Sequence, residues 1–216
     1  MGQGHEPRPL RAILTERSSH GVYLARHGQT AYNLEGRFQG QQPVPLDDTG
    51  RAQAAELAER AATYGFRALW CSPLLRARET ADIVARRIAL EPKEDERLME
   101  TDAGDWTDRS FEEVRGEAPE LFDAFATGVP SFAFPGGESF AEQDERVAAA
   151  LEEIERGTLP ALVVCHGMVI RAALTRRAGH PPERFERVAN GALIPLDAAE
   201  SEEDRRWGGG EATLAS

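Results

Sequence analysis

Short apolar runs alternate with stretches of helical periodicity through most of the chain. The runs are five residues long, are bounded by polar or turn-forming residues, and span residues 21–25, 68–72, 161–165 and 192–196. Such runs are typical of buried strands. The stretches between them repeat their apolar positions every three or four residues, as helices packed on one face do. The alternation predicts an α/β fold, a three-layer α/β/α sandwich with helices on both faces of the sheet.

The ends of the helices are marked by capping residues. Asp47 is placed to cap a helix that runs to about Thr63. Ser139 and Glu142 form a capping box ahead of another helix, and Gly179 is placed to end a helix from about residue 168 to 178. A fourth helix follows Pro73 and carries an apolar stripe of Ala77, Ala81, Val84 and Ile88.

The segment 101–139 differs from the rest because it combines aromatic residues with short helical pieces and Pro-Gly breaks. We interpret it as an insertion, or lid, over the sheet edge, with aromatics that form a small core of their own: Trp106, Phe111, Phe122, Phe125, Phe132 and Phe134. Residues 1–19 are typical of a loose arm and residues 199–216 of a flexible tail. This leaves a single domain over residues 20–198.

Charge and composition narrow the classes of partner. The 216 residues carry a formal net charge of −12, which disfavours nucleic acid and anionic membranes as partners because both are polyanions. No apolar run approaches the roughly 20 residues of a membrane span, and the N-terminus lacks the apolar core of a signal peptide. The two cysteines, Cys71 and Cys165, lie in apolar runs and suggest no disulfide framework. We therefore expect a cytoplasmic protein. A homodimer is left open.

The first candidate for chemistry is Arg26-His27-Gly28, which directly follows an apolar strand. Ligands of open α/β sheets bind at the carboxyl ends of strands. Arg26 offers a planar fork of donors that suits phosphate oxygens. His27 supplies a nitrogen that is nucleophilic near neutral pH, and Gly28 permits close backbone approach.

The same arrangement recurs at His166-Gly167, where a strand turns into a helix whose first N–H groups can hold an anion. Arg76 lies in the first turn of the helix after the second strand, and Glu100 follows Leu98-Met99. Each histidine alone would fit an ordinary buried, hydrogen-bonded residue. Both together, with Arg76 and Glu100, favour a catalytic site. Asp102 and Asp105 compete with Glu100 for the role of acid.

These separated motifs, in this order, resemble the histidine phosphatase superfamily, in the branch of cofactor-dependent phosphoglycerate mutases and small-molecule phosphatases. The resemblance covers roughly residues 20–197. It implies a phosphoglycerate mutase-like fold with a mostly parallel central sheet. It also implies that His27 is the phosphorylated nucleophile and Glu100 the proton donor. The residues it implies for holding the phosphoryl oxygens are Arg26, Arg76, His166 and Gly167, with Asn33 beside them. Asn33 could equally cap a turn, and Gln39 could be structural.

Two positions depart from the family's pattern. The family commonly has an aspartate before the Pro-Leu that follows Gln39-Gly40, where this chain has Gln41-Gln42-Pro43-Val44-Pro45-Leu46. Many of its phosphatases have glycine two residues after the tryptophan, where this chain has Asp108. Both changes lie outside the expected catalytic set.

The expected function is therefore hydrolysis of a small phosphorylated metabolite through a phosphohistidine, with no metal and no cofactor. No acidic cluster has the spacing of a metal site, and two arginines with a second histidine can neutralise a phosphoryl group. A phosphoglycerate mutase is the nearest alternative, although the segment after Glu100 is short and has only Arg109 and Arg115 as basic residues. A non-catalytic phospho-ligand binding module is the second alternative.

Overall fold

The computed structural model describes residues 21–179 and 188–197, whose centre is a five-stranded sheet in the order β3-β2-β4-β1-β5. All neighbouring pairs are parallel except β1 and β5. The strands are β1 (Val22–Arg26), β2 (Ala68–Cys71), β3 (Pro92–Glu94), β4 (Ala161–Cys165) and β5 (Leu193–Pro195). The four predicted strands are confirmed to within one residue. The edge strand β3 was not predicted, because three residues that include a proline and two charged side chains carry no apolar signal.

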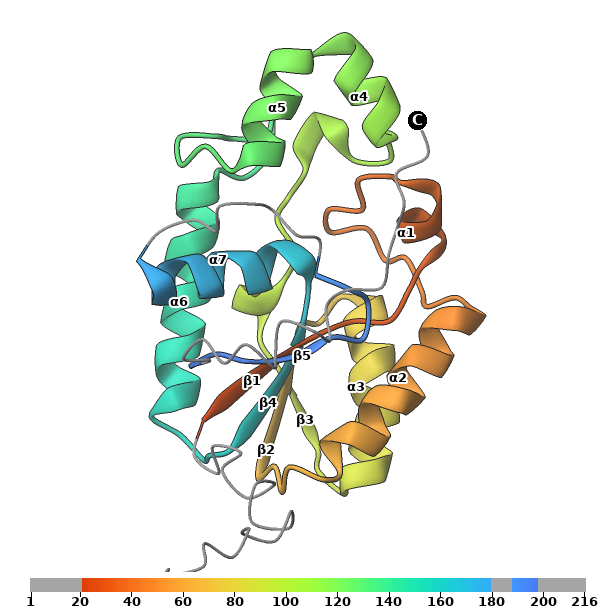
Figure 1. Ribbon diagram of the computed structural model, residues 1–216, viewed down its shortest axis with the longest axis vertical. Helices are drawn as coiled ribbons and strands as arrows, with labels where there is room; N and C mark the ends of the chain where they lie inside the picture. The colour runs from red at the N-terminus through yellow and green to blue at the C-terminus, as the bar shows by residue number, and fades with distance from the viewer. Residues whose placement is uncertain (1–20, 180–187, 198–216) are drawn as a thin grey trace, which may run out of the picture.

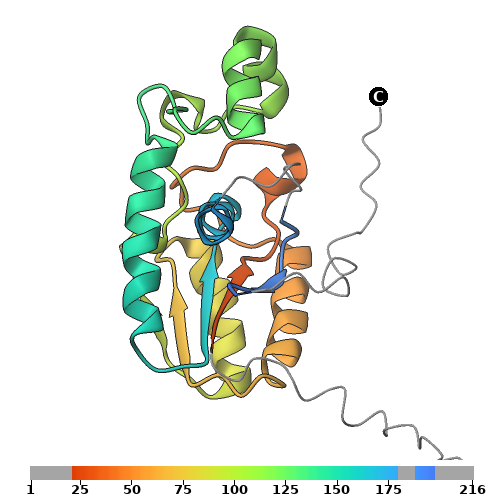
Figure 2. The same cartoon turned by 60° about the vertical axis from the view of Figure 1, so that its left-hand side comes forward.

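Two pairs of helices cover the sheet and make the three predicted layers (Figures 1 and 2). Side chains alternate along each central strand, so that Leu24 and Val163 face one helix layer while Ala25 and Val164 face the other. The first layer is α6 (Phe140–Glu155) with α7 (Gly167–Ala178), and the second is α2 (Asp48–Ala61) with α3 (Leu75–Ile88). Strands buried on both faces explain why the sequence shows continuous apolar runs.

The predicted capping residues are confirmed. Asp47 accepts a hydrogen bond from the Gly50 N–H at the start of α2, and Ser139 and Glu142 form the reciprocal box at the start of α6. Gly179 ends α7 with a φ of 75°, in the left-handed region that favours glycine. These local signals explain why the helix boundaries could be predicted closely.

The segment 101–139 holds the short helices α4 (Phe111–Glu117) and α5 (Pro119–Thr127). Its aromatics form the predicted separate core, to which Phe38 also belongs. The predicted position over the sheet edge is wrong: α4 and α5 lie beyond the carboxyl ends of the strands (Figures 1 and 2). The chain leaves β3 at that end and returns to α6 at the same end, so the segment caps the sheet there. We call residues 101–139 the cap.

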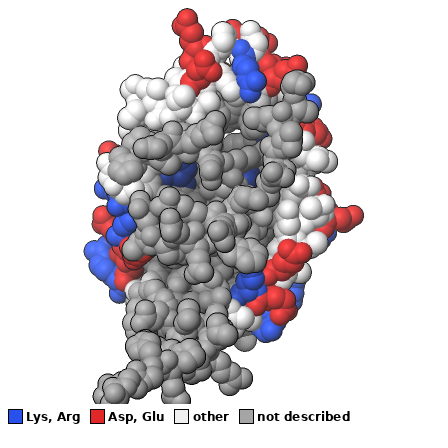
Figure 3. Space-filling model, in the orientation of Figure 1, with Lys and Arg blue, Asp and Glu red and all other residues white. Residues whose placement is uncertain are grey.

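Charged surface residues pair locally, and acidic and basic side chains are interspersed along the described rim in Figure 3. Arg87 of α3 binds Glu59 of α2, and Arg176 of α7 binds Asp144 of α6. Arg87 and Arg176 therefore lie on solvated helix faces. Within residues 21–179 and 188–197, no helix is long and apolar enough to cross a membrane. The predicted arm and tail lie outside the described residues.

Candidate active site

A cavity of about 330 Å³ opens between the carboxyl ends of the strands and the cap. Its lining includes six of the predicted site residues: Arg26, His27, Asn33, Arg76, Glu100 and Gly167. The seventh, His166, is fully buried behind them. Residues that are far apart in the sequence therefore meet at one place, as the rule for ligand sites in open α/β sheets anticipates.

His27 is fixed in one orientation at the end of β1. Its backbone N–H donates to the Cys165 carbonyl at 3.0 Å, which extends the β1–β4 pairing by one residue. Its ring Nδ1 lies 2.7 Å from the Gly28 carbonyl, which can only accept, so Nδ1 carries the ring proton. Burial and the charges of Arg76 and Arg26 lower the pKa of His27 well below its ordinary value. The ring is therefore neutral, with the Nε2 lone pair free to attack.

His166 is held by Ser72, the residue that directly follows β2. The Ser72 hydroxyl lies 2.8 Å from His166 Nε2 and accepts the Leu74 N–H at 3.2 Å. We assign the hydroxyl proton to Nε2, which makes Nδ1 the protonated nitrogen, the tautomer that can donate to an anion. That Nδ1 is buried and has no hydrogen-bond partner among the described residues. Burial, followed by the charge of Arg76, lowers the pKa of His166.

The two histidine rings lie side by side, with centroids 5.1 Å apart and planes tilted by 57°. This is the spacing of rings in direct contact. The rings are too close for an anion to lie between them, so an anion would bind on the side of the cavity, which His27 lines.

Arg76 and Arg26 bring two guanidinium groups to the histidines. Arg76 is 1% exposed and donates to the carbonyls of Gln42 and Gly40, while its Nε has no partner within the described ranges. Burial lowers the pKa of Arg76 to about 10, and Glu100 partly offsets this. Arg26 donates to the Val188 carbonyl at 2.5 Å. Both side chains are thus held by contacts with backbone carbonyls, which carry no charge.

Glu100 lies against the start of α7. Its Oε1 accepts the N–H of Thr101 at 3.0 Å and its Oε2 accepts the N–H of Met168 at 3.4 Å. This places the Glu100 carboxyl group beside the N-terminus of α7 and near the charge of Arg76. Its competitors point elsewhere: Asp102 accepts from the Gly104 N–H, and neither Asp102 nor Asp105 lines the cavity.

Asn33 belongs to the cavity wall and also caps a helix. It forms a capping box with Thr30 at the start of α1 (Ala31–Glu35), a helix too short for the sequence pattern to reveal. Its Oδ1 also accepts from Asn190, whose amide donates to the His27 carbonyl at 3.0 Å. The helix-capping role is confirmed, while a place for Asn33 beside a bound phosphoryl group stays a prediction. Asn190 had no sequence signal, because its role depends on β5 returning beside β1.

The backbone restricts which residues can occupy two positions discussed in the sequence analysis, Gly28 and Asp108. A Cβ at Gly28 would lie 2.2 Å from the Gly50 carbonyl oxygen, so the close approach seen here is that of helix α2. Asp108 adopts a φ of 68°, which explains the family's preference for glycine at this position. Its carboxylate accepts the Tyr32 hydroxyl at 2.6 Å, a contact that glycine cannot make.

One wall of the cavity is apolar, although Arg37 and Arg171 also line the cavity. Phe38, Phe111, Phe125 and Phe134 line it from the cap side, with Leu174 from α7. Trp106 is buried and lies outside this lining, packed among the cap phenylalanines. In the part of the chain that the structure describes, no three His, Cys, Asp or Glu side chains gather as a metal site would require.

A neutral imidazole nitrogen next to two guanidinium groups suits attack on phosphorus, because phosphoryl transfer depends on positioning and charge neutralisation. Fold and site thus define an α/β phosphatase of the histidine type. The family model of the histidine phosphatase superfamily (branch 1) matches residues 22–206. The chain belongs to this superfamily.

Relatives within it carry different activities in their names. The chain is 35% identical over 186 residues to a probable phosphoglycerate mutase, GpmB, of Salmonella paratyphi B, covering 84% of this chain and 86% of that one. A mycobacterial glucosyl-3-phosphoglycerate phosphatase in complex with VO3 is 29% identical with a TM-score of 0.73, over 81% of this chain and 89% of that one. A phosphoserine phosphatase mutant of Entamoeba histolytica, in complex with phosphoserine, is 26% identical with a TM-score of 0.70, over 80% and 87%.

Proposed function

We propose that the protein hydrolyses small phosphomonoesters through a phosphohistidine on His27, with Glu100 as proton donor. One observation carries the proposal: two buried histidines of lowered pKa lie beside two arginines, and two buried donors, His166 Nδ1 and Arg76 Nε, have no partner among the described residues. Buried donors are almost always satisfied. The oxygens of a phosphoryl group would satisfy both donors.

In the first step, His27 Nε2 attacks phosphorus and the bond to the ester oxygen breaks. Arg26, Arg76 and His166 bind the three outer oxygens, while the N–H of Gly167 adds a helix-start donor. The departing oxygen takes the proton of Glu100 and leaves as an alcohol.

In the second step, water replaces the alcohol. The Glu100 carboxylate takes a proton from this water, whose oxygen attacks phosphorus and releases His27 and inorganic phosphate. Glu100 ends protonated again, so atoms and charges balance over the cycle. The step asks for no metal, and the VO3 complex of the mycobacterial relative supports a phosphoryl-sized anion site in this family.

The apolar wall of the cavity favours a substrate with an apolar or aromatic leaving group. Phe111, Phe125 and Leu174 offer no hydrogen bonds to the hydroxyls of a sugar or glycerate. The two basic residues of the cap point away: Arg109 pairs with Glu117, and Arg115 stacks on Phe122. Two further arginines, Arg37 and Arg171, line the cavity, so its cations alone do not separate a phosphatase from a mutase.

The decisive experiment is trapping of the phosphoenzyme in the presence of EDTA. His27→Ala should form none. Glu100→Gln should lose ~10²- to 10⁴-fold in rate on butyl phosphate, yet still become phosphorylated by nitrophenyl phosphate, whose leaving group departs unprotonated. An acid-labile, base-stable label should then accumulate on the peptide with Arg26-His27-Gly28. Asp102→Asn and Asp105→Asn are the matched controls and should turn over normally.

Each alternative has its own outcome in this experiment. Label on the His166 peptide would mean that His166, and not His27, is the nucleophile. Full activity of Glu100→Gln on butyl phosphate would move the acid to Asp102 or Asp105. Isomerisation of a phosphoglycerate without release of phosphate would identify a mutase, and phosphate-ester binding without turnover would identify a binding module.

A further inference from the structure

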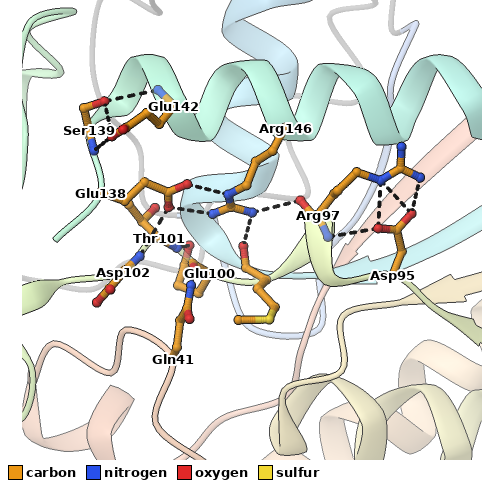
Figure 4. A network of polar contacts seen from close by, with 11 residues as sticks. Gln41, Asp95, Arg97, Glu100, Thr101, Asp102, Glu138, Ser139, Glu142 and Arg146 are labelled. Carbon is orange, nitrogen blue, oxygen red and sulfur yellow. Dashed lines mark hydrogen bonds and ion pairs between the residues drawn. The ribbon is translucent and has the colours of Figure 1, made fainter.

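Arg146 of α6 binds the backbone of the segment that carries Glu100. Its Nη1 donates to two carbonyls of that segment, Arg97 at 2.8 Å and Met99 at 2.7 Å (Figure 4). Only 20% of its side chain is exposed. One guanidinium nitrogen therefore fixes the backbone immediately before Glu100.

Glu138 binds the other side of the same guanidinium and the other end of the same segment. Its two carboxylate oxygens accept from Arg146 Nε at 2.5 Å and Nη2 at 2.8 Å, in the bidentate geometry of strong ion pairs. Its Oε2 also accepts the Asp102 N–H at 3.3 Å, and its own N–H donates to the Asp102 carbonyl at 3.0 Å. The pair thus holds residues 99 and 102, on both sides of Glu100.

The Glu100 side chain depends on this backbone for its position. Its carboxylate contacts two backbone N–H groups, those of Thr101 and Met168, and its carbonyl accepts from Gln41 at 3.2 Å. A shift of the segment by a fraction of an ångström would therefore move the carboxylate relative to the leaving oxygen. A misplacement of about 1 Å is enough to cost a large part of a catalytic effect.

We propose that the Arg146–Glu138 ion pair is the positioning device of the general acid, holding Glu100 at the leaving-group oxygen. The proposal rests on the proposed role of Glu100. Neither residue lines the cavity, so each acts through Glu100 and touches no reacting atom.

The test compares leaving groups, because a misplaced acid harms only those that need a proton. Arg146→Gln and Glu138→Gln should lower kcat on butyl phosphate at least about tenfold more than the phosphorylation step with nitrophenyl phosphate. KM should change little, since the cavity lining is untouched. Arg146→Lys should behave like Arg146→Gln, because an ammonium lacks the planar fork that makes the four contacts. Glu153→Gln is the matched control. Glu153 lies on α6, as Arg146 does, and its loss removes only an ion pair with Arg97. The ratio of the rates on the two substrates should stay unchanged.

A double-mutant cycle separates positioning from general support of the fold. If Arg146 acts through Glu100, adding Arg146→Gln to Glu100→Gln should cause no further selective loss on butyl phosphate. Equal losses on both substrates in the Arg146 and Glu138 variants, with Glu100→Gln still selective, would overturn the positioning role alone. A Glu100→Gln enzyme without selective loss would instead overturn the proposed function. Glu138→Gln keeps size and shape, so it covers the case in which Arg146 variants fail to fold.

Discussion

Ser72 illustrates how much of this site depends on one buried hydroxyl. It orients His166 from behind and is fully buried itself. Ser72→Ala would leave His166 Nε2 and the Leu74 N–H without their hydrogen bonds, which costs about 1–3 kcal/mol of stability for each buried group left unpaired. We expect kcat to fall with little change in KM, because the ring loses its fixed tautomer.

The measurement for Ser72→Ala is nitrogen NMR of the histidine rings beside steady-state kinetics. The wild type should show His166 protonated on Nδ1, and the variant should show a mixture of tautomers. Thr80→Val is a suitable comparison, since it removes a buried hydroxyl that holds the Gly28 N–H and leaves His166 untouched. An unchanged His166 spectrum in Ser72→Ala would contradict the assigned role.

Some residues of the site could be predicted from the sequence and others could not. His27 and His166 could be predicted because each follows a buried strand and precedes glycine, a combination that core packing does not require. Arg146 could not: it lies on a helix face that is otherwise rich in charge, and its partners are 8 to 49 positions away. Asn190 was missed for the same reason, because its contacts to residues 27 and 33 exist only once β5 lies beside β1.

Among the elements, the cap should decide which substrates are accepted. Phe125 of α5 lines the cavity and is partly exposed there, so Phe125→Leu should lower kcat/KM for aryl esters about five- to twentyfold through lost ring contact. Butyl phosphate should change less. Rates for a panel of aryl and alkyl phosphates would measure this change in ranking, and Phe134, which also lines the cavity, should follow the same pattern.

Trp106 gives the control within the same cluster. It is buried beside Phe134 but lies outside the cavity lining, so Trp106→Phe should reduce stability and leave the ranking unchanged. Equal shifts in ranking from Trp106→Phe and Phe125→Leu would mean that the cap acts only as a core. The sequence alone grouped Trp106 with Phe134 as residues of one lid, and only the packing separates them.

Elements with strong periodic patterns or caps could be predicted, and short elements could not. Helix α2 begins where Asp47 predicts, and α6 where Ser139 predicts. Strand β3 and helix α1 have three and five residues, and tertiary pairing stabilises them more than their own sequence does. The position of the cap depends on where β3 ends, so missing β3 also misplaced the cap.

Across the whole molecule, the two buried histidines make stability depend on pH. Both have a pKa lowered in the folded protein, by burial first and then by Arg76. The unfolded chain therefore binds more protons below about pH 6.5, and the free energy of unfolding falls as the pH falls. Each neutral histidine contributes a slope of about 1.4 kcal/mol per pH unit there, so the pair should give nearly twice that. Paired carboxylates such as Asp95, whose pKa is lowered by Arg97, add to the loss only at lower pH.

Urea unfolding at pH 7.5, 6.5 and 5.5 checks this dependence. His27→Gln and His166→Gln should each remove about half of the slope between pH 6.5 and 5.5, because glutamine takes up no proton in either state. A slope that survives both substitutions would mean that other groups control acid stability and that the histidines are charged in the fold. In that case His27 would lack the free lone pair on which phosphoryl transfer depends.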